Sequence, residues 1–169
     1  MSGLYHAMST FEKQLPRSGL LEQAIRSATN YAVLRLCRTA STLDSNMQNL
    51  SVNSKNINTV KWGEEYYKYC MFDSFAVEGI HVDSDFSDCT FNNIEWYWGI
   101  FNIVKFINCK FNNCVFKGTT FPDCLFVECE FNNCSFTKDN LDGDCEFENS
   151  RAYNCKVVNT RGFNATIRN

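Results

Sequence analysis

Ten cysteines and two histidines have the greatest capacity for chemistry in this chain, because thiolates and imidazoles are zinc ligands and thiolates are nucleophiles. Structural zinc sites commonly use cysteine pairs two to four residues apart, often completed by histidine. Here His6 and His81 lie in no Cys-His pattern, and many cysteines are separated by five residues or a multiple of five. The spacing therefore predicts no metal site and no cofactor. Nine cysteines follow residue 50: Cys70, Cys89, Cys109, Cys114, Cys124, Cys129, Cys134, Cys145 and Cys155.

Acidic residues gather toward the C-terminal end of the sequence. From Asp123 to Glu148 there are eight acidic residues against one basic residue, Lys138. Such a patch can steer a basic protein partner into contact, and the alternative is a chance cluster on a solvated surface. We predict a partner-binding surface from these residues: Asp142, Asp144, Glu146, Glu148, Glu128 and Glu130. A basic band precedes it, with Lys105, Lys110 and Lys117.

No arrangement of residues predicts catalysis. The sequence has no nucleophile elbow, no phosphate-binding loop and no zinc-protease motif. Carboxylates are plentiful, but they fall at positions expected to face solvent. We therefore expect a protein that is not an enzyme.

A period of five residues governs the elements that carry these side chains. Phe-Asn-Asn occurs three times at intervals of twenty residues, beginning at Phe91, Phe111 and Phe131. Helices and ordinary strands have periods of 3.6 and 2, so a period of five within twenty predicts a coil with four equivalent sides. Phenylalanine recurs at this spacing at Phe101, Phe106, Phe111, Phe116, Phe121, Phe126, Phe131 and Phe136.

We expect the repeated phenylalanines to point into the coil. The residue two positions before each of them should point inward too, because side chains alternate along an extended segment. All nine cysteines after residue 50 fall in this position once two shifts of frame are allowed. A free thiol behaves as a small hydrophobe, which suits a position beside a large ring. We therefore expect buried, reduced cysteines and no disulfides.

The two shifts of frame set the expected register of the later coils. One residue is missing before Phe86, and one is extra after Leu141. If the side that holds Phe86 is counted as the first, this frame places Leu141 on the fourth side, inside the coil, and Phe147 on the first side. It gives about six coils in total.

With its five-residue unit, the chain resembles the pentapeptide-repeat family, in which a small residue and a polar residue precede Leu or Phe and two polar residues follow. Residues 109–113 (CKFNN) and 129–133 (CEFNN) match this unit directly. The resemblance covers residues 51–169 and implies a mainly β fold, the right-handed quadrilateral β-helix.

Residues 1–50 lack the period. Leu21, Ile25 and Leu36 follow helical spacing, which predicts a helix at residues 19–38 with Ser18 as its N-cap. We interpret residues 1–50 as a helical segment that caps the first coil, since solenoids need capped ends. The alternative is a basic amphipathic helix that docks on a partner or a membrane.

Composition excludes some classes of partner. The formal net charge of −3 favours neither nucleic acid nor a strongly acidic role. No apolar run is long enough to span a membrane, and the N-terminus lacks the features of a secretory signal. We therefore expect a cytoplasmic protein whose partner is another protein.

Three functions fit this sequence. The first is a non-catalytic protein-binding module, an inhibitor or immunity protein whose charged faces bind a toxin. The second, implied by the resemblance, is a DNA mimic that protects DNA gyrase or a similar topoisomerase. The third, also implied by it, is a secreted bacterial effector with a non-repeat N-terminus. The edge of the last coil could pair with a second copy to form a homodimer.

Overall fold

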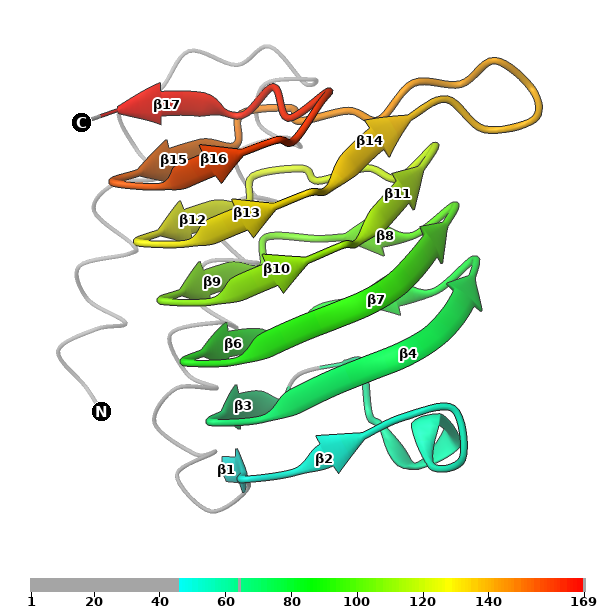
Figure 1. The fold of residues 1–169 in the computed structure, drawn as a ribbon, viewed down its shortest axis with the longest axis vertical. Helices are drawn as coiled ribbons and strands as arrows, with labels where there is room; N and C mark the ends of the chain where they lie inside the picture. The colour runs from blue at the N-terminus through cyan, green and yellow to red at the C-terminus, as the bar shows by residue number, and fades with distance from the viewer. Residues whose placement is uncertain (1–45, 64, 169) are drawn as a thin grey trace, which may run out of the picture. The chain divides into compact units, whose positions relative to one another are not determined.

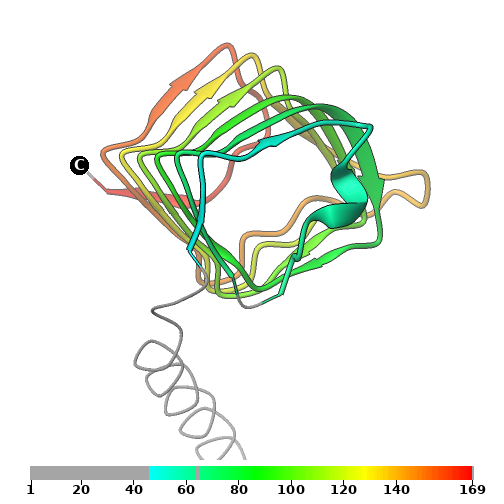
Figure 2. The ribbon, with the colours of Figure 1, turned by 90° about the horizontal axis from the view of Figure 1, so that it is seen from below.

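The computed structural model describes residues 46–63 and 65–168. These residues form a solenoid of short parallel strands with a four-sided outline (Figure 2). Seen in Figure 2, the chain turns clockwise as it recedes from the viewer, so the coil is right-handed. The mainly β, quadrilateral fold expected from the sequence is confirmed. The expected helix at residues 19–38, with Ser18 as its N-cap, lies outside the described residues.

Each strand pairs in parallel with the strand one coil away, so every side is a parallel sheet (Figure 1). The first side carries β1 (Asn46–Gln48), β3 (Tyr66–Lys68), β6 (Asp85–Ser87), β9 (Lys105–Ile107), β12 (Leu125–Val127), β15 (Arg151–Tyr153) and β17 (Thr166–Arg168). The second side carries β2 (Ser51–Val52), β10 (Lys110–Asn112), β13 (Glu130–Asn132) and β16 (Lys156–Val158). The third side carries β11 (Val115–Lys117) and β14 (Ser135–Thr137), and the long strands β4 (Met71–Glu78) and β7 (Thr90–Tyr97) bend from the second side onto it. The fourth side carries β5 (His81–Val82) and β8 (Ile100–Phe101).

The number of complete coils is smaller than the six predicted. On the fourth side the strand and bridge pairs among the described residues span four levels, His81, Ile100, Thr120 and Glu146, and below them one backbone hydrogen bond joins Asp83 to Trp62. In the first coil a 3-10 helix, η1 (Ile57–Thr59), lies where the third side would have a strand. No helix in the part of the chain that the structure describes has the length and apolar character needed to cross a membrane.

The last coil has three sides instead of four. Arg161 pairs with Ser135 on the third side, and the chain then returns directly to the first side, where β17 pairs with β15. Phe163 lies on this shortcut, with its ring centroid 4.4 Å from that of Phe131. Its ring also contacts Phe126 and Phe136, so it closes the end of the aromatic core, where no further coil of the described residues follows.

The core consists of aromatic columns, one residue per coil. On the second side Phe72, Phe91, Phe111 and Phe131 stack with centroids 4.8–4.9 Å apart and nearly parallel rings. All four are at most 3% exposed. Rings of neighbouring sides meet edge to face, as Phe86 and Phe91 do, and such pairs add to the stabilisation from burial alone.

The Phe-Asn-Asn triplets have a physical explanation in this fold. The second asparagine of each triplet turns the corner between the second and third sides with a positive φ, as Asn113 does at 53°. Asparagine tolerates this left-handed conformation better than most residues. The first asparagine belongs to an amide ladder, in which Asn112 donates to Asn92 at 2.9 Å and Asn132 donates to Asn112 at 3.1 Å.

The register predicted after Phe136 is wrong. Leu141 is 75% exposed and does not enter the core, and Phe147 stacks on Phe121, which belongs to the fourth side, at 4.8 Å. The chain therefore leaves the solenoid after β14 and returns at Cys145, and residues 147–162 lie one side earlier than predicted. Ile167 lies on the first side as predicted, because the last coil has only three sides. Continuing the repeat through Leu141 would bury Asp139 in the inward position, and burying an unpaired carboxylate is costly.

Candidate functional site

The cysteines line the inside of the solenoid. On the second side Cys89, Cys109 and Cys129 succeed one another, one coil apart, and are essentially inaccessible. Each thiol contacts backbone carbonyl oxygens, and Cys129 Sγ donates to the carbonyl of Phe106 at 3.3 Å. Burial raises the pKa of Cys109. Within residues 46–63 and 65–168 no three His, Cys, Asp or Glu side chains are placed to hold a metal ion.

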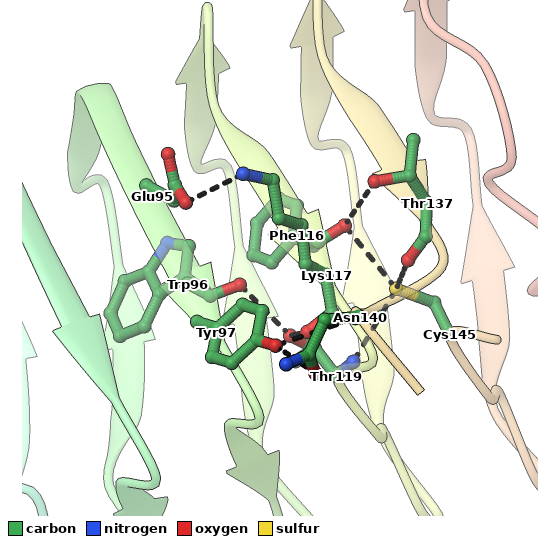
Figure 3. A network of polar contacts seen from close by, with 9 residues as sticks. All are labelled: Glu95, Trp96, Tyr97, Phe116, Lys117, Thr119, Thr137, Asn140 and Cys145. Carbon is green, nitrogen blue, oxygen red and sulfur yellow. Dashed lines mark hydrogen bonds and ion pairs between the residues drawn. The ribbon is translucent and has the colours of Figure 1, made fainter. Parts of the chain in front are cut away.

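The basic band lies on three different sides and is neutralised there. Lys105 Nζ lies 3.6 Å from a carboxylate oxygen of Asp85 on the first side. Lys117 Nζ lies 2.7 Å from a carboxylate oxygen of Glu95 on the third side (Figure 3). Lys110 faces Glu130 on the second side at 3.8 Å. In each pair the acid belongs to an adjacent coil, so the three lysines form no continuous positive surface.

Glu128 and Glu130 are separated from the other predicted partner-binding residues. Glu130 lies on β13 between Lys110 and Lys156, with Lys156 Nζ at 3.2 Å. The hydrogen bond from Lys156 and the charge of Lys110 lower the pKa of Glu130. Glu128 turns the corner between the first and second sides. The structure does not bring these two acids to the surface that carries Glu146 and Glu148.

Four exposed acids gather at the last two levels of the fourth side, and we call them the acidic ridge: Asp123, Asp144, Glu146 and Glu148. Glu146 and Glu148 flank the inward-facing Phe147, so both point away from the core. Asp144 lies at the corner where the chain rejoins the solenoid. Asp123 comes from the coil below, and its backbone N–H donates to the carbonyl of Glu148 at 2.8 Å. Asp123 was missing from the predicted surface, although it lies one coil from Glu148.

The segment that leaves the solenoid projects from the corner between the third and fourth sides, and we call residues 138–144 the corner loop (Figures 1 and 2). Lys138 Nζ lies 3.4 Å from an oxygen of Asp142, whose side chain is 88% exposed. Asp142 therefore belongs to the corner loop rather than to the acidic ridge, and its charge is partly compensated.

Two aromatic side chains from two coils below hold the corner loop. Trp98 Nε1 donates to Asp139 Oδ2 at 2.5 Å, and the Tyr97 hydroxyl donates to Asn140 Oδ1 (Figure 3 shows Tyr97 and Asn140). Asp139 Oδ1 accepts the backbone N–H groups of Leu141 at 2.7 Å and Gly143 at 2.9 Å. The Trp98 bond, followed by the two backbone bonds, lowers the pKa of Asp139.

The end of the corner loop is fastened inside the solenoid. Cys145 Sγ lies 3.4 Å from the carbonyl oxygens of both Phe116 and Thr137 (Figure 3). The backbone N–H of Thr119 approaches the same sulfur at 3.5 Å. Both ends of the loop are therefore attached to well-packed strands or to the core beneath them.

Sequence reasoning missed Tyr97 and Trp98, although a signal was present. The two positions after the central Trp96 are surface positions, and elsewhere in the repeat these positions hold mostly polar residues and never two aromatic residues together. Trp98 is 37% exposed and has a φ of 52°, a conformation that is strained for a bulky side chain. Two adjacent aromatic residues in surface positions therefore indicated a function outside the core.

Comparisons with known proteins give a limited result. No protein-family model and no curated protein sequence matches the chain. Among solved structures it is similar to two trypsin-treated variants of QnrB1, a plasmid-mediated fluoroquinolone resistance protein. One alignment has 12% identity and a TM-score of 0.48, and covers 68% of this chain and 69% of the other. The second has 10% identity and a TM-score of 0.22, with 68% of each chain covered. We therefore infer function from this chain's own residues.

Proposed function

We propose that this protein is a non-catalytic binding module of the inhibitor or immunity type, which binds a basic protein surface through the acidic ridge. One observation supports this above all. Among the described residues, six acids have neither an ion pair nor a side-chain hydrogen bond, and four of them form the ridge. These six acids are Glu78, Asp123, Glu128, Asp144, Glu146 and Glu148.

The ridge can recruit a partner through its field. Exposed carboxylates without counter-charges attract a basic surface over about 10 Å at moderate ionic strength. Complementary charges increase the rate of association and reject partners of the wrong sign. A rigid solenoid bound over the working surface of a basic toxin would inhibit it without chemistry of its own.

DNA mimicry is less well supported than this proposal. A duplex presents negative charge along its whole length, whereas here Lys105, Lys110 and Lys117 each meet an acid of an adjacent coil. Of the six unpaired acids among the described residues, four gather at one end of one side. The effector hypothesis concerns a signal in residues 1–50, most of which lie outside the described residues.

The test is an affinity capture from the native host, with the intact chain as bait. Glu146 and Glu148 are both changed to Lys in one variant, and Glu78 and Glu128 in a control variant with the same change of net charge. We expect one stoichiometric protein partner, lost from the first variant and retained by the control. Loss from both variants, or from neither, would show that the ridge is not the contact surface. Capture of a topoisomerase would instead favour mimicry.

A further inference from the structure

We propose that Leu141, at the tip of the corner loop, is a hydrophobic anchor that inserts into an apolar pocket on the partner protein, within the basic surface that the acidic ridge contacts. The inference rests on the proposed function and names the chemistry of the partner surface. Leu141 is 75% exposed, far more than the other large apolar side chains of the described residues.

Leu141 is exposed at a step of the repeat where other coils have a buried residue. At the same step of the five-residue period, Phe101 and Phe121 on the fourth side are buried. The chain places Leu141 outside the solenoid and Phe147 in the vacated column instead. A polar residue at position 141 would satisfy the fold equally well, so the fold alone does not explain an apolar tip.

The corner loop is pre-organised for binding. Asp139 fixes the backbone on both sides of the tip by accepting the N–H groups of Leu141 and Gly143. Trp98 fixes Asp139 in turn. Gly118, at a φ of 52°, permits this approach, because a Cβ atom there would lie 2.5 Å from Asp139 Oδ2. A loop that is ordered before binding loses less conformational entropy in the complex.

The neighbours of Leu141 define the kind of pocket it fits. Asp142 adjoins it in the chain, and Asp144 and Glu146 of the ridge follow. Apolar anchors contribute most when charged groups around them pair across the interface and exclude water. The matching surface is an apolar pocket rimmed by lysine or arginine side chains. Phosphate-rich nucleic acid and anionic lipid are unsuitable, because these acids repel both.

Site-specific photo-crosslinking in the native host tests this inference. The probe is p-benzoylphenylalanine, placed in the full chain at Leu141, at Glu148 in the ridge, or at Ile107, an exposed apolar control on the first side. We expect adducts from positions 141 and 148 with the same protein, and none from 107. The peptide joined to position 141 should carry apolar side chains with lysine or arginine beside them.

The outcomes separate this inference from the proposed function. An adduct from position 148 without one from 141 would overturn the anchor and keep the ridge. Adducts from neither position would overturn both. An adduct of position 141 with nucleic acid, lipid or an acidic peptide would overturn the anchor as stated.

Two substitutions measure the contribution of the anchor to capture of the cross-linked protein. Leu141→Ala should weaken binding about tenfold, as removal of an interface anchor worth roughly 1.4 kcal/mol would, with the melting temperature unchanged. Trp98→Phe keeps a ring but removes the donor to Asp139. It should weaken binding severalfold and accelerate hydrogen exchange at the amides of Leu141 and Gly143. Unchanged binding by Leu141→Ala would contradict the inference.

Discussion

The central coils, residues 85–137, and the corner loop show opposite uses of the same kinds of side chain. In the central coils apolar rings point inward and stack, and all three lysines meet acids of adjacent coils. In the corner loop an apolar side chain points outward, and the ridge beside it carries acids without counter-charges among the described residues. In the regular coils the rings and lysines have partners in adjacent coils, although the side chains of Asp123 and Glu128 have none in the described part of the chain. Where the repeat breaks, the apolar tip and the acids that follow it remain available to a partner.

The largest expected effect on stability comes from removing a stacked ring of the central coils. Phe111 lies between Phe91 and Phe131, with both ring centroids 4.8 Å away, and is 3% exposed. Phe111→Ala should lower the free energy of unfolding by about 3–5 kcal/mol, through lost burial and the cavity left behind. Leu141→Ala should change it by less than about 0.5 kcal/mol. Urea denaturation of both variants measures the difference, and similar losses would mean that Leu141 is packed.

A glycine beneath the corner loop should give the next largest effect. Gly118→Ala would place a Cβ atom 2.5 Å from Asp139 Oδ2 at a φ of 52°. We expect a loss on the order of 1–3 kcal/mol, from strain and displacement of Asp139. Gly79 is the matched control, because it has a φ of 62° with no atom within 4 Å of an added Cβ.

The two glycine variants separate strain from steric conflict. Thermal unfolding should show a larger loss for Gly118→Ala than for Gly79→Ala. Only Gly118→Ala should accelerate hydrogen exchange at Leu141 and Gly143. Equal losses with unchanged exchange would indicate that the close approach of Gly118 to Asp139 does not hold the loop.

Acid should loosen the corner loop through protonation of Asp139. The pKa of Asp139 is lowered in the folded protein, chiefly by the hydrogen bond from Trp98. The stabilisation from ionised Asp139 is therefore fully present above its unfolded pKa, about 3.9, and is lost as the pH falls through the folded value. The Trp98 indole N–H resonance should report this loss below about pH 4.

The control for this pH dependence is Asp139→Asn, which keeps an acceptor oxygen but does not ionise. Its Trp98 indole resonance should not titrate over the same range. An indole resonance that shifts at pH 5 or above in the unsubstituted protein, or that shifts equally in the variant, would show that Asp139 is not the group responsible.

The regular part of the fold could be predicted from the sequence because each pentad carries the same signals. The inward phenylalanines, the small thiols beside them and the corner asparagines all agree, and Phe91, Phe111 and Phe131 fix the register of twenty residues per coil. Such agreement between local preferences leaves few competing arrangements. The ends of the solenoid were harder to predict, because Phe163 and the three-sided last coil have no repeated signal.

The corner loop could not be predicted from the period, because Leu141 is an acceptable central residue. What expels the segment is the cost of placing Asp139 in the inward position, together with the contacts that Trp98 offers outside. The acids Asp144, Glu146 and Glu148 lie near one another as expected from their spacing. Glu128 and Glu130 lie elsewhere, because five residues of a pentad turn the chain onto the next side.

The smallest effect is expected on the association rate, when a paired acid and an unpaired acid are each replaced by glutamine. Glu130 is held between Lys110 and Lys156, whereas Glu148 meets no base among the described residues. Glu130→Gln should leave partner binding unchanged. Glu148→Gln should slow association modestly and reduce its dependence on salt, because exposed interface charges act mainly on the association rate. Association rates measured at several salt concentrations decide this. An equal effect of both substitutions would mean that the partner responds to the net charge of the protein. The ion pairs of Glu130 with Lys110 and Lys156 would then not neutralise its effect on the partner.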